Sequence, residues 1–235
     1  MKQAKRENEC ERGEKLRKKI IGQIKEKKII AIVRGVYGDD CRKLTEALQE
    51  GGIGLIEFTF DQKTPDDWKR TCENISMVCR EYGSEMICGS GTVLTEEQVR
   101  LTKNAGGAFI ISPNVNQRVI GETVRQGMVS IPGALSPSEI TDAAEYGADF
   151  VKIFPAASLG AAYLKAIKGP LNHIPLLAVG GVNELNAAEF LRAGAEGVGI
   201  GGNLVNREWI AAGEFDKIRE AARRTIQNCR GEFTV

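Results

Sequence analysis

One lysine lies inside an apolar stretch that is typical of a buried β-strand. Lys152 stands in the segment Asp149–Phe154, and because strand side chains alternate between faces, it shares a face with Phe150 and Phe154. An ammonium group is costly to bury in its charged form, so desolvation lowers the pKa of a lysine, and a neutral amine is a nucleophile. The alternative is a lysine at a strand end that reaches water or pairs with a carboxylate.

A carboxylate and a guanidinium occupy comparable places on other apolar runs. In Leu55–Phe60 every second residue is apolar and must pack under helices, which turns Glu57 to the opposite face. Arg34 directly follows the run Lys28–Val33. Glu57 and Lys152 could form a buried ion pair without function, but desolvation can cancel the Coulomb attraction of such a pair.

Hydroxyl groups complete this set of polar residues. Thr59 shares the face of Glu57, and Ser90 and Thr92 share one face of the run Glu85–Val93. An amine, a carboxylate, a guanidinium and two or three hydroxyls are therefore expected to meet at one end of the strands. Titratable groups that gather in one cleft favour a functional interpretation of the set.

Short apolar runs alternate with amphipathic segments along the whole chain. The strands are expected at Lys28–Val33, Leu55–Phe60, Glu85–Val93, Ala108–Ser112, Val129–Pro132, Asp149–Phe154, Leu176–Val179 and Gly197–Gly201. The helices are expected at Asp39–Glu50, Thr64–Tyr82, Thr95–Asn104, Gln117–Gln126, Ser136–Tyr146, Ala161–Ile167, Glu184–Arg192 and Phe215–Ile226. Thr95–Gln98 and Ser136–Glu139 carry the capping-box pattern of a helix start.

Eight strands, each followed by a helix, predict an α/β fold: a single (β/α)₈ barrel over residues 20–235. The alternative is an open doubly wound sheet, which should have a glycine-rich turn after its first strand, and Arg34–Gly38 fits that pattern poorly. In a barrel, inward residues at the C-terminal strand ends are the functional ones. Residues 1–19 are a mixed-charge run, expected to be a separate, solvated or frayed N-terminal helix or tail.

Two glycine pairs follow the last two expected strands. Gly180 and Gly181 end the seventh strand, and Gly201 and Gly202 end the eighth. In barrels the loops at these places often hold a phosphate, and glycine lets backbone N–H groups approach its oxygens. The alternative is that both pairs are only tight turns.

Composition narrows the classes of partner and site. The chain has 235 residues with 32 basic and 31 acidic side chains, which gives no argument for nucleic acid or an anionic membrane as a partner. One histidine, and six cysteines without a CxxC pair, make a metal site improbable. Scattered cysteines and the lack of a signal peptide or a long apolar run predict a protein of the cytoplasm.

The sequence resembles the KDPG/KHG aldolase family, which consists of pyruvate-releasing class I aldolases. The resemblance runs from about Ile29 to about Leu204. It rests on the combination of Gly51–Ile53, Ile56–Thr59, Gly89–Thr95, Ile111–Pro113, Ile131–Glu139, Val151–Ala156, Leu164–Pro170 and the two glycine pairs.

The resemblance implies a role for most of these polar residues. Lys152 would be the Schiff-base lysine and Glu57 the general acid/base. Thr92 and Pro113 would line the pyruvyl pocket, with Phe154 packed beside the lysine. The two glycine pairs would form the phosphate site, and the protein would be a homotrimer.

Several positions depart from the family's common pattern. Many members have an arginine where this chain has Asp61, whereas other branches have one at the end of the first strand, which Arg34 matches. Arg34 is therefore the candidate for binding the substrate carboxylate. Val179 replaces a common threonine, Asn203 a common serine and Asn114 a common glycine, and these changes concern the middle and distal end of the substrate.

The expected function is cleavage of 2-dehydro-3-deoxy-6-phosphogluconate to pyruvate and glyceraldehyde 3-phosphate through an imine on Lys152. No cofactor or metal is needed, because the protonated imine withdraws electrons as a Lewis acid would. One alternative is an aldolase of 4-hydroxy-2-oxoglutarate or another non-phosphorylated keto acid. Two others are a phosphosugar isomerase that uses Glu57 without an imine, and a non-catalytic barrel that binds phosphometabolites.

Overall fold

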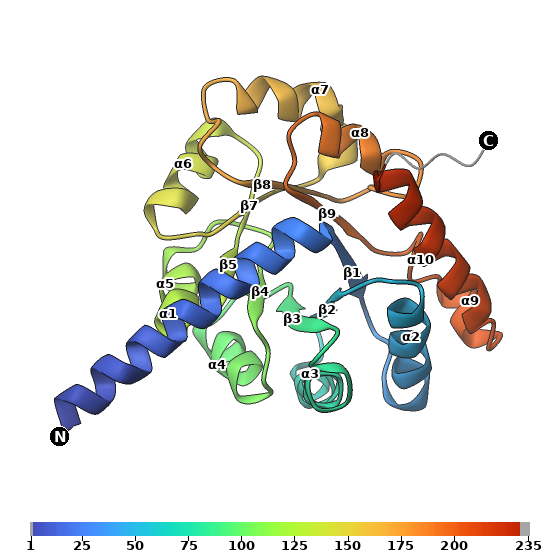
Figure 1. The fold of residues 1–235 in the computed structure, drawn as a ribbon, viewed down its shortest axis with the longest axis horizontal. Helices are drawn as coiled ribbons and strands as arrows, with labels where there is room; N and C mark the ends of the chain where they lie inside the picture. Colours follow the sequence, from blue (N-terminus) through green and yellow to red (C-terminus); the bar gives the residue numbers. More distant parts are fainter. Residues whose placement is uncertain (1, 231–235) are drawn as a thin grey trace.

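Nine parallel strand segments form one sheet, in the order β5-β4-β3-β2-β1-β9-β8-β7-β6 (Figure 1). The computed structural model describes residues 2–230, with side chains from residue 13 onward. The strands are β1 (Ile29–Val33), β2 (Leu55–Thr59), β3 (Ile87–Gly91), β4 (Phe109–Ile111), β5 (Val129–Ile131), β6 (Gly133–Ala134), β7 (Val151–Ile153), β8 (Leu176–Val179) and β9 (Gly197–Ile200).

The two ends of this sheet are parts of one strand. Only Pro132 separates β5 from β6, and β5 pairs with β4 while β6 pairs with β7. Proline has no N–H to give to a ladder, but its carbonyl accepts the N–H of Lys152 at 2.8 Å. The sheet therefore closes into a barrel of eight strands, and the predicted (β/α)₈ fold is confirmed.

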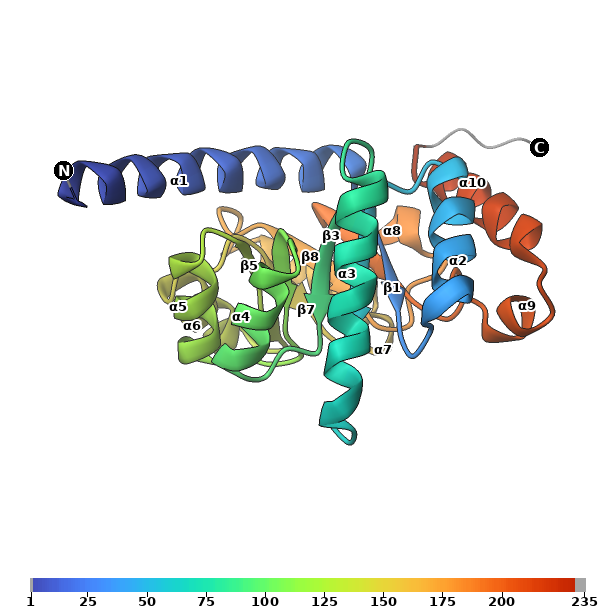
Figure 2. The ribbon, with the colours of Figure 1, turned by 90° about the horizontal axis from the view of Figure 1, so that it is seen from below.

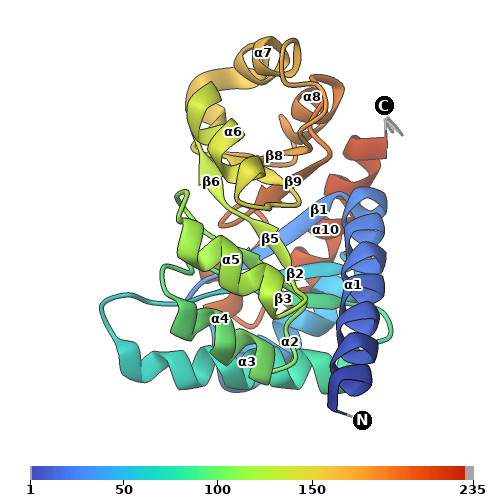
Figure 3. The same cartoon turned by 90° about the vertical axis from the view of Figure 1, so that its left-hand side faces the viewer.

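A helix or helical turn follows every strand, with β5 and β6 counted as one, and lies outside the barrel (Figures 1 and 3). The helices are α1 (Lys2–Lys27), α2 (Gly38–Glu50), α3 (Trp68–Tyr82), α4 (Glu96–Asn104), α5 (Gln117–Arg125), α6 (Pro137–Glu145), α7 (Ala156–Lys168), α8 (Ala187–Arg192), α9 (Arg207–Ala211) and α10 (Phe215–Arg230). Both predicted capping boxes are present, at α4 and at α6. No described helix is long and apolar enough to cross a membrane.

The starts of three helices differ from the sequence-based expectation by more than one residue, for local reasons, and α9 was not expected. Pro65–Asp67 forms a separate 3₁₀ turn before α3. α7 starts at Ala156 and kinks at Gly160, where φ is +76° and ψ is 163°. α8 starts later than expected because the side chains of Asn183 and Asn186 bond to backbone N–H groups and form a turn there.

Alternation along the strands divides the core into an outer and an inner layer. Residues such as Ile56, Phe58 and Val151 pack outward under the helices. Leu55 and Phe150 belong to the cluster inside the barrel. This confirms the predicted orientation of β2 and β7, on which Glu57 and Lys152 point inward.

The N-terminal helix lies along one end of the barrel (Figures 2 and 3). Ile20 and Ile24 join the inner cluster, so the C-terminal part of α1 closes the end opposite the C-terminal strand ends. Arg17 donates to Asp149 at 2.9 Å and to the carbonyl of Gly147 at 3.0 Å. Residues 2–19 of the predicted charged segment thus belong to a helix that continues to Lys27. Its described contacts with the barrel begin at Gly13, which lies 3.5 Å from a Cβ built on Gly127.

Candidate active site

Two titratable side chains lie buried inside the mouth of the barrel. Glu57 is on β2, in register with Ile32 of β1 and Gly89 of β3. Lys152 is on β7, in register with Gly133 of β6. Glu57 is 3% exposed and Lys152 is 6% exposed, so neither group is solvated as a surface ion would be.

Burial shifts both groups toward their neutral forms. Desolvation raises the pKa of the Glu57 carboxyl to about 7, against the opposing charges of Lys152 and Arg34. Desolvation also lowers the pKa of the Lys152 amine, against the charge of Glu57 and with the help of Arg34. A carboxyl that titrates near neutral pH can both give and take a proton, and a deprotonated lysine is a nucleophile.

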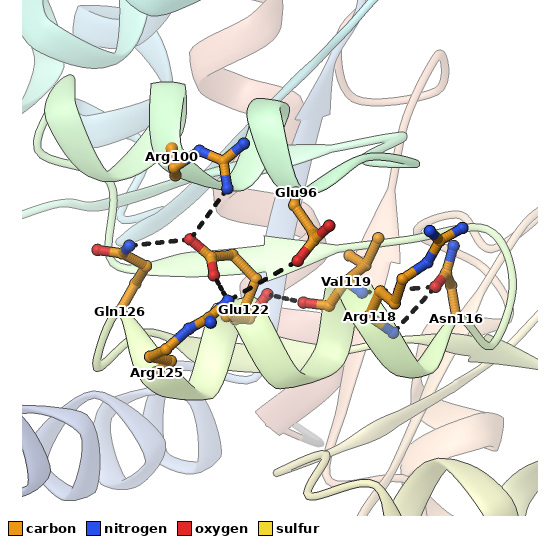
Figure 4. Close-up of polar contacts among 9 residues, drawn as sticks. Glu96, Arg100, Asn116, Arg118, Val119, Glu122, Arg125 and Gln126 are labelled. Carbon is orange, nitrogen blue, oxygen red and sulfur yellow. Dashed lines mark hydrogen bonds and ion pairs between the residues drawn. The ribbon is translucent and has the colours of Figure 1, made fainter.

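A second buried carboxylate serves as a structural comparison. Glu122 of α5 is also 3% exposed, but Arg125 pairs with it, Arg100 lies at 3.6 Å and Gln126 donates at 2.9 Å (Figure 4). In contrast, Oε2 of Glu57 has no hydrogen-bond partner in the described part of the chain. A buried carboxylate oxygen without a partner is costly, and a bound substrate that supplies a proton would explain it.

Glycines on β3 make room for Glu57. A Cβ at Gly91 would lie 1.4 Å from Oε1 of Glu57, and a Cβ at Gly89 would lie 2.4 Å from the Phe109 ring. The inward positions of β3 are therefore glycines, and Ser90 faces outward, where its hydroxyl lies 2.6 Å from that of Thr102 on α4. The prediction that Ser90 points into the barrel is wrong, because the alternation of β3 has the opposite phase.

Thr92 nevertheless reaches the mouth, because it leaves the strand. Its φ is +55°, which breaks the alternation after Gly91. Its hydroxyl accepts a hydrogen bond from Nη2 of Arg34 at 3.4 Å. Arg34 and Thr92, predicted separately, therefore lie together at the ends of β1 and β3.

The remaining predicted pocket residues surround the lysine strand. Nζ of Lys152 lies 4.7 Å from the centre of the Phe154 ring. Pro113 follows β4, and its carbonyl lies 2.5 Å from a Cβ built on Gly133, the residue in register with Lys152. Phe154 and Pro113 thus lie around the strand that carries the amine.

The four predicted phosphate-site glycines fall into two pairs with different surroundings. Gly180 and Gly181 have positive φ, and an added Cβ would meet Phe154 at 2.9 Å or Ala157 at 2.5 Å. Packing against the start of α7 and the turn therefore require glycine at both positions. A Cβ added at Gly201 or Gly202 would meet no atom of the described residues within 4 Å, so packing does not explain these glycines.

Open space beside Gly201 and Gly202 forms a cavity of about 600 Å³ at the ends of β1 and β9. Two guanidinium groups line it, those of Arg34 and Arg207, together with the carboxylate of Glu208. Nη2 of Arg207 donates to the carbonyl of Arg34 at 3.0 Å. A distal anion in this cavity would lie between two glycines and the guanidinium groups of Arg34 and Arg207.

Comparisons with known proteins agree with this geometry. The sequence model described as KDPG and KHG aldolase matches residues 20–221. The chain belongs to this family. It is a lyase of the class I aldolase type.

Individual relatives cover most of both chains. The 2-dehydro-3-deoxy-6-phosphogalactonate aldolase of Escherichia coli (strain K12) is 34% identical over 177 residues, 75% of this chain and 83% of the relative. The 2-dehydro-3-deoxy-phosphogluconate aldolase of Treponema pallidum (strain Nichols) is 33% identical over 202 residues, 85% and 92% of the two chains. Two aldolases of this family with different named substrates are thus about equally similar.

A solved structure of the family carries a covalent adduct. The KDPG aldolase from Legionella pneumophila, captured with pyruvate as a covalent carbinolamine intermediate, has a TM-score of 0.75 and 29% identity over 84% of this chain and 93% of that one. A structure described as native KDPGal has a TM-score of 0.78 and 31% identity over 86% and 94%.

Three residues of this site were not predicted from the sequence. The sequence marks Gly91 only as part of the Gly89–Thr95 motif, although this glycine makes the space for Glu57. Arg207 carries no signal in the sequence, since it meets Arg34 across 173 positions. Gln62, which donates to the carbonyl of Thr92 at 2.7 Å, lies in a loop without a motif.

Proposed function

We propose that this enzyme cleaves a 2-dehydro-3-deoxy-6-phospho sugar acid to pyruvate and glyceraldehyde 3-phosphate, with Lys152 as the imine-forming lysine. One observation carries the proposal. An amine whose pKa is lowered by burial shares the barrel mouth with a carboxyl whose pKa is raised to about 7 and whose Oε2 has no hydrogen-bond partner among the described residues. A structural ion pair would instead hold its carboxylate as Glu122 is held, by direct partners.

The chemistry starts at the amine. Neutral Lys152 attacks the C2 ketone of the keto acid, and Glu57 moves the protons while the carbinolamine loses water. The resulting protonated imine draws electrons toward nitrogen. Glu57 then takes the proton of the C4 hydroxyl, the C3–C4 bond breaks, and the electron pair forms an enamine while glyceraldehyde 3-phosphate leaves.

The second half of the cycle returns the enzyme to its starting state. Glu57 gives the proton back to C3 of the enamine, which restores the imine. Water then hydrolyses the imine to pyruvate and free Lys152. A pKa near 7 suits Glu57 to this double role, because a general acid/base works best when its pKa lies close to the operating pH.

Charged groups at the mouth hold the two anionic ends of the substrate in this proposal. The guanidinium of Arg34, next to the Thr92 hydroxyl, binds the C1 carboxylate, since a guanidinium can contact both carboxylate oxygens. Asp61 cannot take that role, and its carboxylate accepts the N–H of Lys63 within its own loop. The phosphate binds in the cavity of Gly201, Gly202 and Arg207, with the turn at Gly180 and Gly181 following the neighbouring strand β8, which pairs with β9.

The configuration at C4 leaves two candidate substrates. The sequence favoured 2-dehydro-3-deoxy-6-phosphogluconate as the substrate. The galactonate epimer is a second candidate, because two relatives at 34% identity carry that substrate in their names and because Val179 presents a buried apolar side chain where a threonine is common. Values of kcat/KM for the two epimers decide between them.

The test of the general proposal compares three substrates. The unmodified protein should cleave at least one of the two phosphorylated epimers with a higher kcat/KM than 4-hydroxy-2-oxoglutarate. An equal or higher value for 4-hydroxy-2-oxoglutarate would instead identify the non-phosphorylated keto acid as the substrate. A protein that isomerises a phosphosugar without releasing pyruvate, or that only binds one, would refute aldol chemistry.

Two further proposals concern assembly and location; the first rests on the resemblance to the family and the second on the scattered cysteines of the chain. We expect a homotrimer, which light scattering of the purified protein tests. We expect the protein in the cytoplasm, which cell fractionation tests.

A further inference from the structure

Thr92 has a backbone conformation that a threonine rarely adopts. Its φ of +55° lies in the left-handed region, where a β-branched residue is an outlier. Such strain persists only where surrounding contacts over-determine it, and it gathers at ligand-binding sites. The contacts that hold Thr92 are therefore part of the site.

The side chain of Gln62 forms a hydrogen bond directly with the backbone of Thr92. Nε2 of Gln62 donates to the carbonyl of Thr92 at 2.7 Å, while the hydroxyl of Thr92 stays on the side of Arg34. The carbonyl and the hydroxyl of Thr92 thus have separate partners. Release of the carbonyl would let Thr92 relax toward a negative φ and carry its hydroxyl away from Arg34.

Gln62 is itself fixed in place by a buried glutamine. Its Oε1 accepts from Nε2 of Gln98 at 3.1 Å, and Gln98 is fully buried on α4. Oε1 of Gln98 accepts the N–H groups of Leu94 and Thr95 at 2.7 and 3.2 Å. The chain of bonds therefore runs from the cap of α4 through Gln98 and Gln62 to Thr92.

The loop that carries Gln62 is anchored at both sides. Phe60 donates its N–H to the carbonyl of Gly91 at 2.9 Å, and Nε1 of Trp68 donates to the carbonyl of Asp61 at 2.8 Å. Gln62 therefore does not need to be ordered by substrate before it can hold Thr92. The neighbouring Lys63 is exposed.

We infer that Gln62 is a positioning residue for keto-acid binding: it holds Thr92 in the left-handed conformation that keeps the hydroxyl beside Arg34 in the pyruvyl pocket. The inference rests on the proposed function, since it takes Lys152 as the imine-forming lysine. Gln62 acts on the binding of the pyruvyl end of the substrate rather than on the proton transfers of Glu57. Loss of Gln62 should therefore raise the pyruvate concentration that gives half-saturation and leave the maximal rate of imine formation unchanged.

The experiment measures inactivation by borohydride over a range of pyruvate concentrations. In Gln62→Ala the half-saturating pyruvate concentration should rise about tenfold, equivalent to about 1.4 kcal/mol and comparable to one neutral hydrogen bond. The maximal inactivation rate should stay within about twofold, as expected for lost binding alone. Lys63→Ala, in the same loop, should match the unmodified protein.

Two further variants separate the bond to Thr92 from general packing of the loop. Gln62→Glu keeps an acceptor for Gln98 but loses the donor to Thr92, so it should be impaired at least as much as Gln62→Ala. Thr92→Gly adopts positive φ without strain and lacks the hydroxyl, so adding Gln62→Ala to it should change little; double-mutant cycles measure this coupling.

Each other outcome has a definite meaning. Unchanged half-saturation in Gln62→Ala, normal behaviour of Gln62→Glu, or additive effects with Thr92→Gly would overturn the positioning role. A loss shared by Lys63→Ala would show that the loop as a whole matters and would also overturn it. If pyruvate and borohydride do not inactivate the unmodified protein at all, the proposed imine chemistry fails, which is a separate result.

Discussion

A methyl group added at Gly91 should disable the enzyme by moving a neighbouring carboxylate. The Cβ of Gly91→Ala would lie 1.4 Å from Oε1 and 2.3 Å from Cδ of Glu57, whereas real Cβ contacts essentially never fall under 3.0 Å. The carboxylate must therefore move by about 1.6 Å. The backbone does not oppose alanine, because the φ of Gly91 is not positive.

The magnitude of the loss follows from this displacement. A misplacement of about 1 Å can lower a rate by about a hundredfold, and loss of a positioned acid/base has a similar effect. Overpacking of a core costs about 1–3 kcal/mol of folding stability, and each kcal/mol lowers Tm by about 2–4 °C in a chain of this size. Gly91→Ala should thus remain folded, with kcat reduced about a hundredfold or more.

The assay follows aldol cleavage and thermal unfolding in parallel. Gly121→Ala is the matched control, because nothing lies within 4 Å of its added Cβ and it sits on helix α5. It should keep full activity and the Tm of the unmodified protein or a slightly higher one. Activity of Gly91→Ala close to that of the unmodified protein would show that the position of Glu57 does not control turnover.

Substitutions at three charged residues test the other parts of the site. Glu57→Gln should lower kcat about a hundredfold and remove the acidic limb near pH 7 in kcat/KM. The pKa of Glu57 rises from 4.5 to about 7 on burial, so the stability that its protonated form contributes is full below pH 4.5 and is lost as the pH rises through 7. The free energy of unfolding, measured in urea, should therefore depend less on pH in Glu57→Gln than in the unmodified protein across this window. An unchanged pH dependence would contradict the burial argument. Arg34→Lys should raise the KM of the keto acid above that of the unmodified protein, because an ammonium cannot make the bidentate contact. An unchanged KM in Arg34→Ala would show that another group binds the substrate carboxylate. Arg207→Ala should lower kcat/KM for the phosphorylated substrate about tenfold or more, the scale of a charge-assisted hydrogen bond, and should leave kcat/KM for the unphosphorylated sugar acid unchanged. An equal loss of kcat/KM for both substrates would limit the role of Arg207 to its hydrogen bond with the carbonyl of Arg34.

The sequence was sufficient to predict the parts of the site that lie on regular strands. Glu57 and Lys152 were placed correctly because alternation holds along β2 and β7, whose outward residues are large and apolar. The same reasoning failed for Ser90, because glycines occupy the inward positions of β3 and leave no apolar pattern to set the phase. Two-residue periodicity is reliable only where one face is marked by bulky side chains.

Contacts between distant segments were beyond prediction from local patterns. The carbonyl of Thr92, a residue with left-handed φ, accepts a hydrogen bond from Gln62, 30 positions away. The hydrogen bond between Arg207 and Arg34 spans 173 positions. The docking of α1 through Arg17 also depends on Asp149, far along the chain. Each of these is a polar contact of a single side chain, which carries no periodic signal.

Covalent trapping of the lysine tests the central claim most directly. The protein is incubated with pyruvate and borohydride, digested, and the adduct is mapped by mass spectrometry. The account predicts one reduced pyruvyl adduct, on Lys152, and none in Lys152→Arg. An adduct on Lys165 or Lys168 of α7, or no pyruvate-dependent adduct at all, would contradict it.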